Sequence, residues 1–187
     1  MNENVTDLKA RLRTHSLSNR SIGLASESAE QFGRLLIELC RQVGARTIGV
    51  YISFGSEPAT DVFILKAKSA GLVLAAPRTG PEFSMEFGLL EGPTSSSSFG
   101  FLQPVGDVVE PEQIDLIIAP ALSVAKTGAR LGRGGGFFDR YLEDFAGPVA
   151  GVVYDHEFVS ELPVEPHDAN VNYVVTESAI LALPLTR

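Results

Sequence analysis

The sequence predicts an α/β fold, in which an open, largely parallel sheet is flanked by helices in three layers. Strand-like apolar segments alternate with helix-like segments along the chain, the order that is typical of parallel sheets. The clearest strand, residues 114–120, is short and apolar apart from Asp115, as expected of a strand that is buried on both faces. A length of 187 residues suits one compact domain, so we expect a single domain over 1–187.

The other elements are predicted from periodicity, residue type and stop signals. Phe32, Leu35, Leu36 and Leu39 recur at helical spacing, which predicts a helix over about 5–43 that ends at Gly44. Further helices are expected at 61–71 and 136–145. Strands are expected at 46–54, 72–77, 148–154 and 172–178, with a short strand or hairpin arm at 85–90. The serine-rich segment 92–98 is predicted to be a polar connector without a functional role.

Three loops are expected to meet at one edge of this sheet. Residues 54–60, 77–80 and 119–136 each follow the carboxyl end of a predicted parallel strand. Ligands of open α/β sheets bind beyond these carboxyl ends. We therefore expect the functional site among these three loops.

Composition and charge exclude several classes of protein. The net charge is −8, which argues against a general nucleic-acid binder, because such proteins carry a basic face. No window is long and apolar enough for a membrane-spanning helix, and the N-terminus has no signal-peptide pattern. The single cysteine, Cys40, cannot form an internal disulfide. We expect a cytoplasmic monomer that acts on a small molecule, with no nucleic-acid or membrane partner.

The segment TGARLGRGGGFFDRYL, residues 127–142, carries the strongest chemical signal. Glycines between a strand and a helix let backbone N–H groups converge on a phosphate, and Arg130 and Arg133 add positive charge. Asp139 follows one helical turn later, where a carboxylate can ligate Mg²⁺. The alternative is a tight connection that needs positive φ angles. These residues favour a nucleotide phosphate site over that alternative.

RLGRGGGFFDRYL closely resembles the RLG(Y/R)G(G/K)GYYDR(Y/F)L signature of the 5-formyltetrahydrofolate cyclo-ligase family, also called 5,10-methenyltetrahydrofolate synthetase. The resemblance extends in order through YISFGSEPATD, APR, MEF, FGFLQP, DLIIAPAL and ELPVEPHDANVNYVVTE. It implies conversion of 5-formyltetrahydrofolate to 5,10-methenyltetrahydrofolate with ATP and Mg²⁺ and release of ADP and phosphate. It also implies that the formyl oxygen is phosphorylated before N10 attacks the formyl carbon, and that the folate substrate can be polyglutamylated.

The resemblance also implies roles for individual residues. Catalysis would rest on Arg130 and Asp139, with Asp139 as the Mg²⁺ ligand. The ATP site would be formed by Lys9, Arg13, Arg130, Gly132, Arg133, Gly134, Gly135, Gly136 and Phe137. For Lys9 and Arg13 the alternative is an ordinary solvated helix face.

The folate site is the second part of what the resemblance implies. Glu57 would accept hydrogen bonds from the pterin edge, although an acid that favours a helix N-terminus is the alternative reading. Phe54 and Met85 would form apolar walls or pack in the core. Arg78 is the candidate partner of the folate carboxylates.

The sequence departs from the family pattern at Ala125, where the family usually has an acidic residue. This departure keeps open a second function, that of a folate- or nucleotide-binding protein that regulates or sequesters without catalysis. A sugar-phosphate isomerase or transferase on a similar sheet is a third reading, which rests on fold analogy alone. Because Arg130, the glycines, Asp139 and Glu57 are all retained, we favour the enzyme.

Overall fold

The computed structural model describes residues 4–20 and 22–184. Its helices are α1 (Val5–Asn19), α2 (Ile22–Val43), α3 (Asp61–Ser69) and α4 (Phe137–Glu143). In this part of the chain, an eight-stranded sheet has the order β13 (Ile180–Ala182), β12 (Tyr173–Val175), β10 (Val149–Val152), β7 (Leu116–Pro120), β1 (Thr47–Val50), β2 (Val73–Thr79), β3 (Met85–Leu89) and β6 (Val108–Val109). Two small sheets are formed by β11 (Phe158–Val159), β8 (Ser123–Ala125) and β9 (Arg130–Leu131), and by β4 (Thr94–Ser96) and β5 (Leu102–Pro104).

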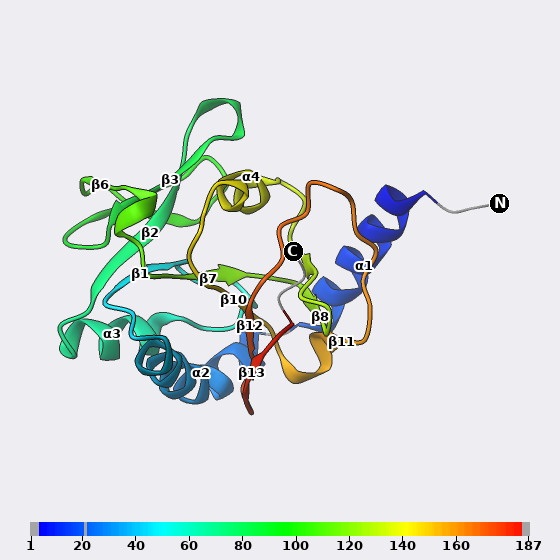
Figure 1. The fold of residues 1–187 in the computed structure, drawn as a ribbon, viewed down its shortest axis with the longest axis horizontal. Coiled ribbons are helices and arrows are strands. Elements are labelled where there is room, and N and C mark those ends of the chain that lie inside the picture. Colours follow the sequence, from blue (N-terminus) through cyan, green and yellow to red (C-terminus); the bar gives the residue numbers. More distant parts are fainter. Residues whose placement is uncertain (1–3, 21, 185–187) are drawn as a thin grey trace.

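The large sheet is parallel in its centre and antiparallel at its edges. Strands β12, β10, β7, β1 and β2 pair in parallel, whereas β13, β3 and β6 pair antiparallel. Helices α2 and α3 cover one face of the sheet, and α4 lies on the other (Figure 1). The predicted α/β class, with a largely parallel sheet flanked by helices, is confirmed.

The apolar run of β7 faces two separate cores, because successive side chains of a strand point to opposite faces. Leu116 and Ile118 pack with α2 and α3, together with fully buried Phe32 and Phe63. Ile117 and its neighbours on the other face pack with α4 and with β8. Full burial of each large apolar side chain contributes about 1.5–3 kcal/mol. A strand sandwiched in this way has no polar face, which explains why its sequence reads as continuously apolar.

The predicted helix over 5–43 is wrong as a single element, because the chain leaves the helical conformation at Arg20. Arg20 has φ −84° and ψ 143°, and α2 starts two residues later. Its guanidinium is buried, with Nε 2.7 Å from Glu157 Oε1 and Nη2 2.5 Å from the Ala121 carbonyl oxygen. Leaving the buried guanidinium unpaired would cost more free energy than interrupting the helix, so the chain breaks the helix where Arg20 can reach its partners.

Other segments also differ from the prediction. The serine-rich connector contains β4, which pairs with β5, and the Ser97 hydroxyl accepts the N–H groups of Phe99 and Phe101. The C-terminal edge gains β13, which no alternation in the sequence indicated. Strands β5, β6, β8, β9 and β11 were not predicted either, and β8 and β9 lie within the predicted loop 119–136. The predicted strands and the other predicted helices are present and differ only at their ends. In the described residues, no helix is long and apolar enough to cross a membrane.

We predict that Gly49→Ala destabilises the protein by about 1–3 kcal/mol, the usual cost of overpacking a core. A Cβ at Gly49 would lie 2.7 Å from Cε1 of Phe87. The Phe87 ring packs against Tyr141, with 5.0 Å between the ring centroids, so it has little room to move away. Chemical denaturation measures this loss. The double variant Gly49→Ala/Phe87→Leu should lose less than the sum of the two single variants, and strict additivity would contradict the proposed clash.

Candidate functional site

A cavity of about 470 Å³ lies at the carboxyl edge of the parallel strands. Its walls come from all three loops that were expected to meet there. Phe54 and Glu57 follow β1, Thr79 ends β2, Pro120 ends β7, and residues 121–122 follow it. The glycine segment of residues 132–136 and Asp139 at the start of α4 close another side. The parallel topology therefore gathers residues from distant parts of the sequence into one site.

Most of the predicted site residues line this cavity. They are Phe54, Glu57, Met85, Arg130, Gly132, Arg133, Gly134, Gly135, Gly136, Phe137 and Asp139. Lys9, Arg13 and Arg78 do not line it. Arg13 is close by, because its Nε donates to the Gly132 carbonyl oxygen at 2.9 Å. Arg78 instead pairs with Glu86 at 2.7 Å and donates to the Gly106 carbonyl oxygen.

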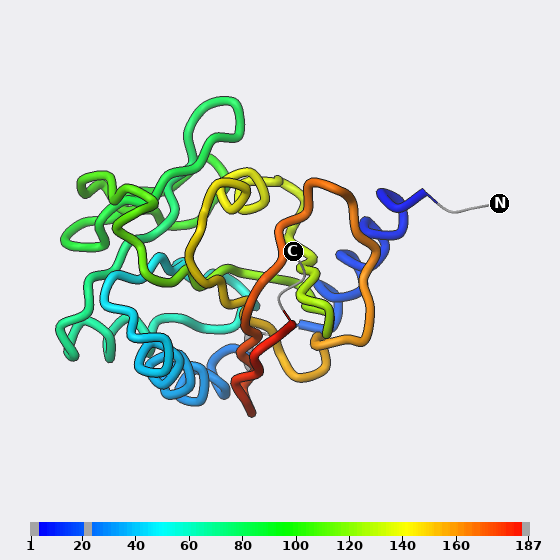
Figure 2. The backbone as a smooth tube through the Cα atoms, viewed as in Figure 1, coloured from blue at the N-terminus to red at the C-terminus, as the bar shows by residue number. Residues whose placement is uncertain are grey.

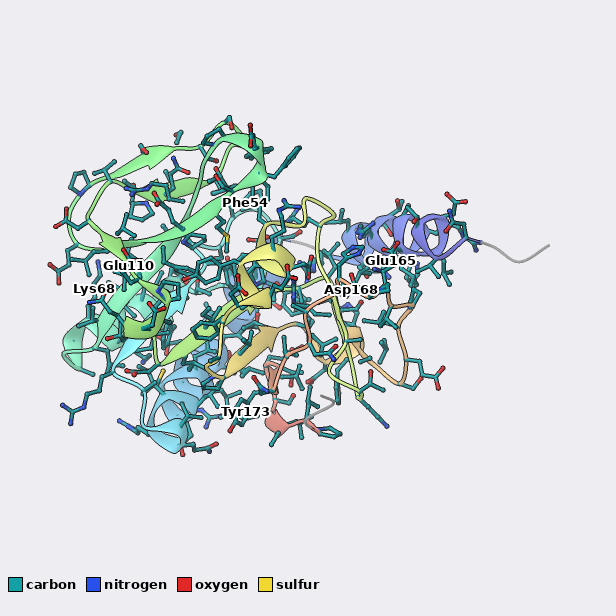
Figure 3. The ribbon with its side chains drawn as sticks, turned by 45° about the horizontal axis from the view of Figure 1, so that its top comes forward. Phe54, Lys68, Glu110, Glu165, Asp168 and Tyr173 are labelled. Atoms are coloured by element: carbon teal, nitrogen blue, oxygen red, sulfur yellow. The ribbon has the colours of Figure 1, made fainter. Side chains whose placement is uncertain are left out.

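Lys9 lies in a polar cluster beside the cavity. Its side chain is 4% exposed, and Nζ is 2.8 Å from Glu165 Oε2 and 2.5 Å from Asp168 Oδ2. Figure 2 shows the chain around these carboxylates (orange) running beside α1 (blue), and Figure 3 labels both acids next to that helix. The hydrogen bond from Lys9 lowers the pKa of Glu165. Burial acts to raise the pKa of Asp168, but Lys9 and the Glu165 N–H together lower it.

Glu165, His167 and Asp168 lie close enough together to be examined as ligands of one metal ion. Ligand atoms of Glu165, His167 and Asp168 lie within 4.8 Å of one another. The ammonium group of Lys9 already binds both carboxylates. In this structure the cluster therefore acts as an ion-pair network that fixes α1.

The glycine segment wraps around guanidinium groups. Gly134 and Gly136 have φ of 98° and 68°, which disfavour any residue with a side chain. A Cβ at Gly136 would lie 2.8 Å from Arg140 Nη1, and one at Gly134 would lie 3.3 Å from Arg13 Cζ. The glycines are thus needed both for the backbone conformation and for the close approach of these arginines.

Four arginines, Arg13, Arg130, Arg133 and Arg140, surround this segment with more positive charge than its acids neutralise. Arg130 Nη2 is 2.5 Å from Asp139 Oδ1, and Arg133 Nε is 2.9 Å from Glu57 Oε1. Within residues 4–20 and 22–184, Arg13 and Arg140 form no ion pair with a carboxylate. Arg140 Nη2 donates instead to the carbonyl oxygens of Phe83 and Gly135. Two guanidinium charges are therefore available to a polyanion.

The cavity wall also contains a buried carboxylate, that of Glu57, and several aromatic rings. The Glu57 side chain is 5% exposed, and its Oε2 accepts the Phe54 N–H at 3.2 Å. Burial raises the pKa of Glu57, while the charge and hydrogen bond of Arg133 and the Phe54 N–H act to lower it. Phe54 is 39% exposed and is labelled beside the β-hairpin region in Figure 3. A buried acceptor under an exposed ring suits a flat ligand that has paired N–H donors.

The aromatic wall that continues from Phe54 was not predicted as a unit. We call Phe54, Phe101, Phe99, Phe137 and Phe83 the phenylalanine row, since neighbouring ring centroids are 5.3–6.3 Å apart along it. Phe99 and Phe101 come from the β4–β5 hairpin, which had been predicted to be a connector. The one available signal was the aromatic pair that follows the serines, FGF.

Ala125 lies away from this cavity. Its side chain is fully buried on β8, and its N–H donates to the Ala129 carbonyl oxygen. It does not line the cavity, so the absence of an acid at this position removes no carboxylate from the cavity wall.

Comparison with known proteins shows the family of the chain. The 5-formyltetrahydrofolate cyclo-ligase family model matches residues 3–177. A protein named 5-formyltetrahydrofolate cyclo-ligase from Mycolicibacterium smegmatis is 34% identical over 94% of this chain and 97% of its own length. One of the same name from Escherichia coli K12 is 32% identical over 74% of this chain and 81% of its own.

A solved structure gives the same result. The NMR structure of Aquifex aeolicus 5,10-methenyltetrahydrofolate synthetase has a TM-score of 0.80 and 27% identity, covering 96% of this chain and 95% of that one. The relatives that match are enzymes by name, and the match extends over nearly the whole chain. The chain therefore belongs to the 5-formyltetrahydrofolate cyclo-ligase family of enzymes.

Proposed function

We propose that this enzyme converts 5-formyltetrahydrofolate to 5,10-methenyltetrahydrofolate in the cytoplasm, with consumption of ATP and a requirement for Mg²⁺. The observation that carries the proposal is that one cavity joins a buried carboxylate under an aromatic ring to a glycine segment surrounded by arginines. These two ends suit the two different substrates of such a reaction, a pterin and a triphosphate. The family membership of the chain supports the same reaction.

The proposed chemistry begins with attack of the formyl oxygen on the γ-phosphorus, which breaks the β,γ P–O bond and releases ADP. N10 then attacks the activated formyl carbon, and the C–O bond breaks so that inorganic phosphate leaves with the formyl oxygen. N10 loses its proton to solvent, and the ring closes as the methenyl product. An N-formyl oxygen is a poor leaving group until it is phosphorylated, which explains the need for ATP. The protein must mainly align the two substrates and offset phosphoryl charge.

The pterin is proposed to bind at Glu57. The carboxylate would accept the 2-amino and N3–H donors of the pterin, which compensates for its burial. Phe54 and Met85 line the cavity there and offer apolar contact to the ring. The phenylalanine row, of which Phe54, Phe83 and Phe99 are exposed, also lines the cavity and could contact the rest of the folate. Arg78 stays a candidate for the tail carboxylates, in exchange for its present partner Glu86.

The triphosphate is proposed to bind along the glycine segment. Arg130, Arg133 and Arg13 would offset its charge, backbone N–H groups of Gly132 and residues 134–136 would bind its oxygens, and Phe137 would pack beside it. Asp139 faces the cavity with its side chain 20% exposed and offers the oxygen ligands that Mg²⁺ prefers. Bound there, the ion would neutralise phosphate charge. Lys9 would join only by leaving Glu165 and Asp168.

Non-catalytic binding was suggested by Ala125 alone, and the buried position of this residue outside the cavity weakens that suggestion. All the groups that the proposed reaction needs lie around one cavity or directly beside it. We therefore retain only the catalytic function.

The direct test is an absorbance assay. We expect purified protein with 5-formyltetrahydrofolate, ATP and Mg²⁺ to produce the methenyl chromophore and one ADP per product. Removing Mg²⁺ with a chelator should stop the reaction, and adding it back should restore it. Binding of both substrates without any turnover would support sequestration instead.

Asp139→Asn should lower Mg²⁺-dependent turnover about 10²–10³-fold, the scale that is typical of losing one electrostatic group in a transition state. Asparagine keeps an oxygen toward Arg130, so folding and folate binding should persist. Turnover at varied Mg²⁺ and calorimetric folate binding measure the two effects. Asp144→Asn, at an exposed position just after α4, is the matched control. Equal loss of folate affinity and turnover would make Asp139 a structural residue.

Folate affinity should depend on pH through Glu57. Only the ionised carboxylate accepts both pterin donors, so affinity should fall as the pH falls through the pKa of Glu57, which burial holds above its ordinary value. Glu57→Gln should weaken folate binding by about 1.5–3 kcal/mol and remove this pH step. Calorimetry across pH measures both, with exposed Glu143→Gln as control. A step that persists in Glu57→Gln would transfer the pH dependence to another group.

A further inference from the structure

The guanidinium group of Arg133 occupies the space expected for a pterin. Its Nε donates to Glu57 Oε1 at 2.9 Å, and its Cζ lies 4.8 Å from the centroid of the Phe54 ring. A planar group with N–H donors therefore lies over an aromatic face, with its donor edge on a buried carboxylate. These are the two contacts that the proposed function assigns to the pterin.

The guanidinium group of Arg133 is also chemically similar to one edge of a pterin. In a pterin, the planar carbon C2 is bonded to three nitrogens, N1, N3 and the 2-amino group. The central carbon of a guanidinium group is also planar and bonded to three nitrogens. Each presents parallel N–H donors that match the two oxygens of a carboxylate. Both groups also stack favourably on a ring such as Phe54. One carboxylate cannot hold both groups at the same edge, so the pterin has to displace Arg133.

We propose that Arg133 is an intramolecular placeholder for the pterin, and that its exchange between Glu57 and the nucleotide phosphates couples the binding of the two substrates. This inference rests on the proposed function. When the pterin takes over Glu57, the guanidinium is released beside the glycine segment. When phosphates attract the guanidinium, Glu57 is released for the pterin. Each ligand should therefore strengthen the binding of the other by the same factor, because coupling free energy is reciprocal.

The burial of Glu57 makes this exchange obligatory. Its side chain is 5% exposed, so a carboxylate left there without donors would pay a large desolvation cost. Burial raises the pKa of Glu57, and the charge of Arg133 is the strongest influence that opposes the rise. Departure of Arg133 is thus favourable only when another set of donors replaces it. Binding of the pterin at Glu57 and binding of the phosphates by Arg133 therefore favour each other.

The second ion pair in the cavity differs in a way that identifies Arg133 as the exchanging group. The Arg130 side chain is 2% exposed, and it is fixed by Asp139 and by the Pro120 carbonyl oxygen at 3.2 Å. The Arg133 side chain is 40% exposed, and its neighbour Gly134 has a positive φ. Arg133 can therefore turn toward solvent or phosphate without leaving a buried guanidinium unpaired, whereas Arg130 cannot.

Isothermal titration calorimetry tests the proposal with 5-formyltetrahydrofolate and the β,γ-imido analogue of ATP with Mg²⁺, at a mildly alkaline pH. In the wild-type protein the analogue should tighten folate binding about 5- to 150-fold, the usual range of coupling between sites. In Arg133→Gln this factor should fall to about twofold or less. Arg133→Lys keeps a charge that can exchange, so it should retain more coupling than the glutamine variant.

Arg41→Gln is the matched control, since Arg41 is an exposed arginine that pairs with Glu38 at 3.9 Å, and it should keep the full coupling. Thermal unfolding should show that the Arg133 variants remain folded. Wild-type coupling in Arg133→Gln, or equal coupling in the lysine and glutamine variants, would overturn the exchange. Independent binding of both ligands to the wild-type protein would remove this inference alone. Failure to bind either ligand would remove the proposed function as well.

Discussion

The buried guanidinium of Arg130 holds the glycine segment against the end of the sheet. Nη1 donates to the Pro120 carbonyl oxygen at the end of β7, and Nη2 pairs with Asp139 at the start of α4. The Phe138 ring lies 5.7 Å from its Cζ. Removing one partner of such a buried pair typically costs about 3–5 kcal/mol. The segment between these anchors thus stays over the cavity, although its glycines permit many conformations.

The N-terminal helix is placed by polar contacts rather than by an apolar face. The buried residues of α1 are Lys9 and Ser16. Lys9 pairs with two acids of the C-terminal segment, and Arg20 pairs with Glu157 from the loop after β10. These contacts bring Arg13, from the start of the chain, to the glycine segment. The charge around the cavity therefore depends on ion pairs that join residues more than one hundred positions apart.

The cavity itself combines opposite electrostatic requirements. The proposed phosphate site would need surplus positive charge, and the proposed pterin site would need a buried negative charge. Arg133 and Glu57 form an ion pair that neutralises both charges. A single ion pair thus satisfies both sites at once. The same pair is the feature that can make occupation of one site sensitive to the other.

Local pattern was sufficient for much of the fold. The apolar run of β7, the helical spacing in α2 and the stop at Gly44 each predicted an element, because their causes lie within a few residues. The edge of the sheet that carries the cavity also followed from strand order. The break at Arg20 did not, because it depends on Glu157, which lies far away along the chain.

The sequence by itself determined the α/β class, the family resemblance and about half of the residues of the cavity wall, because these depend on residue type and order. Only the tertiary structure decided which charges meet. It paired Lys9 with Glu165 and Asp168, Arg78 with Glu86, and Arg133 with Glu57, and it brought Phe99 and Phe101 to the cavity. Ion pairs and ring contacts form across the sheet between residues with no local spacing rule, so no sequence pattern specifies them.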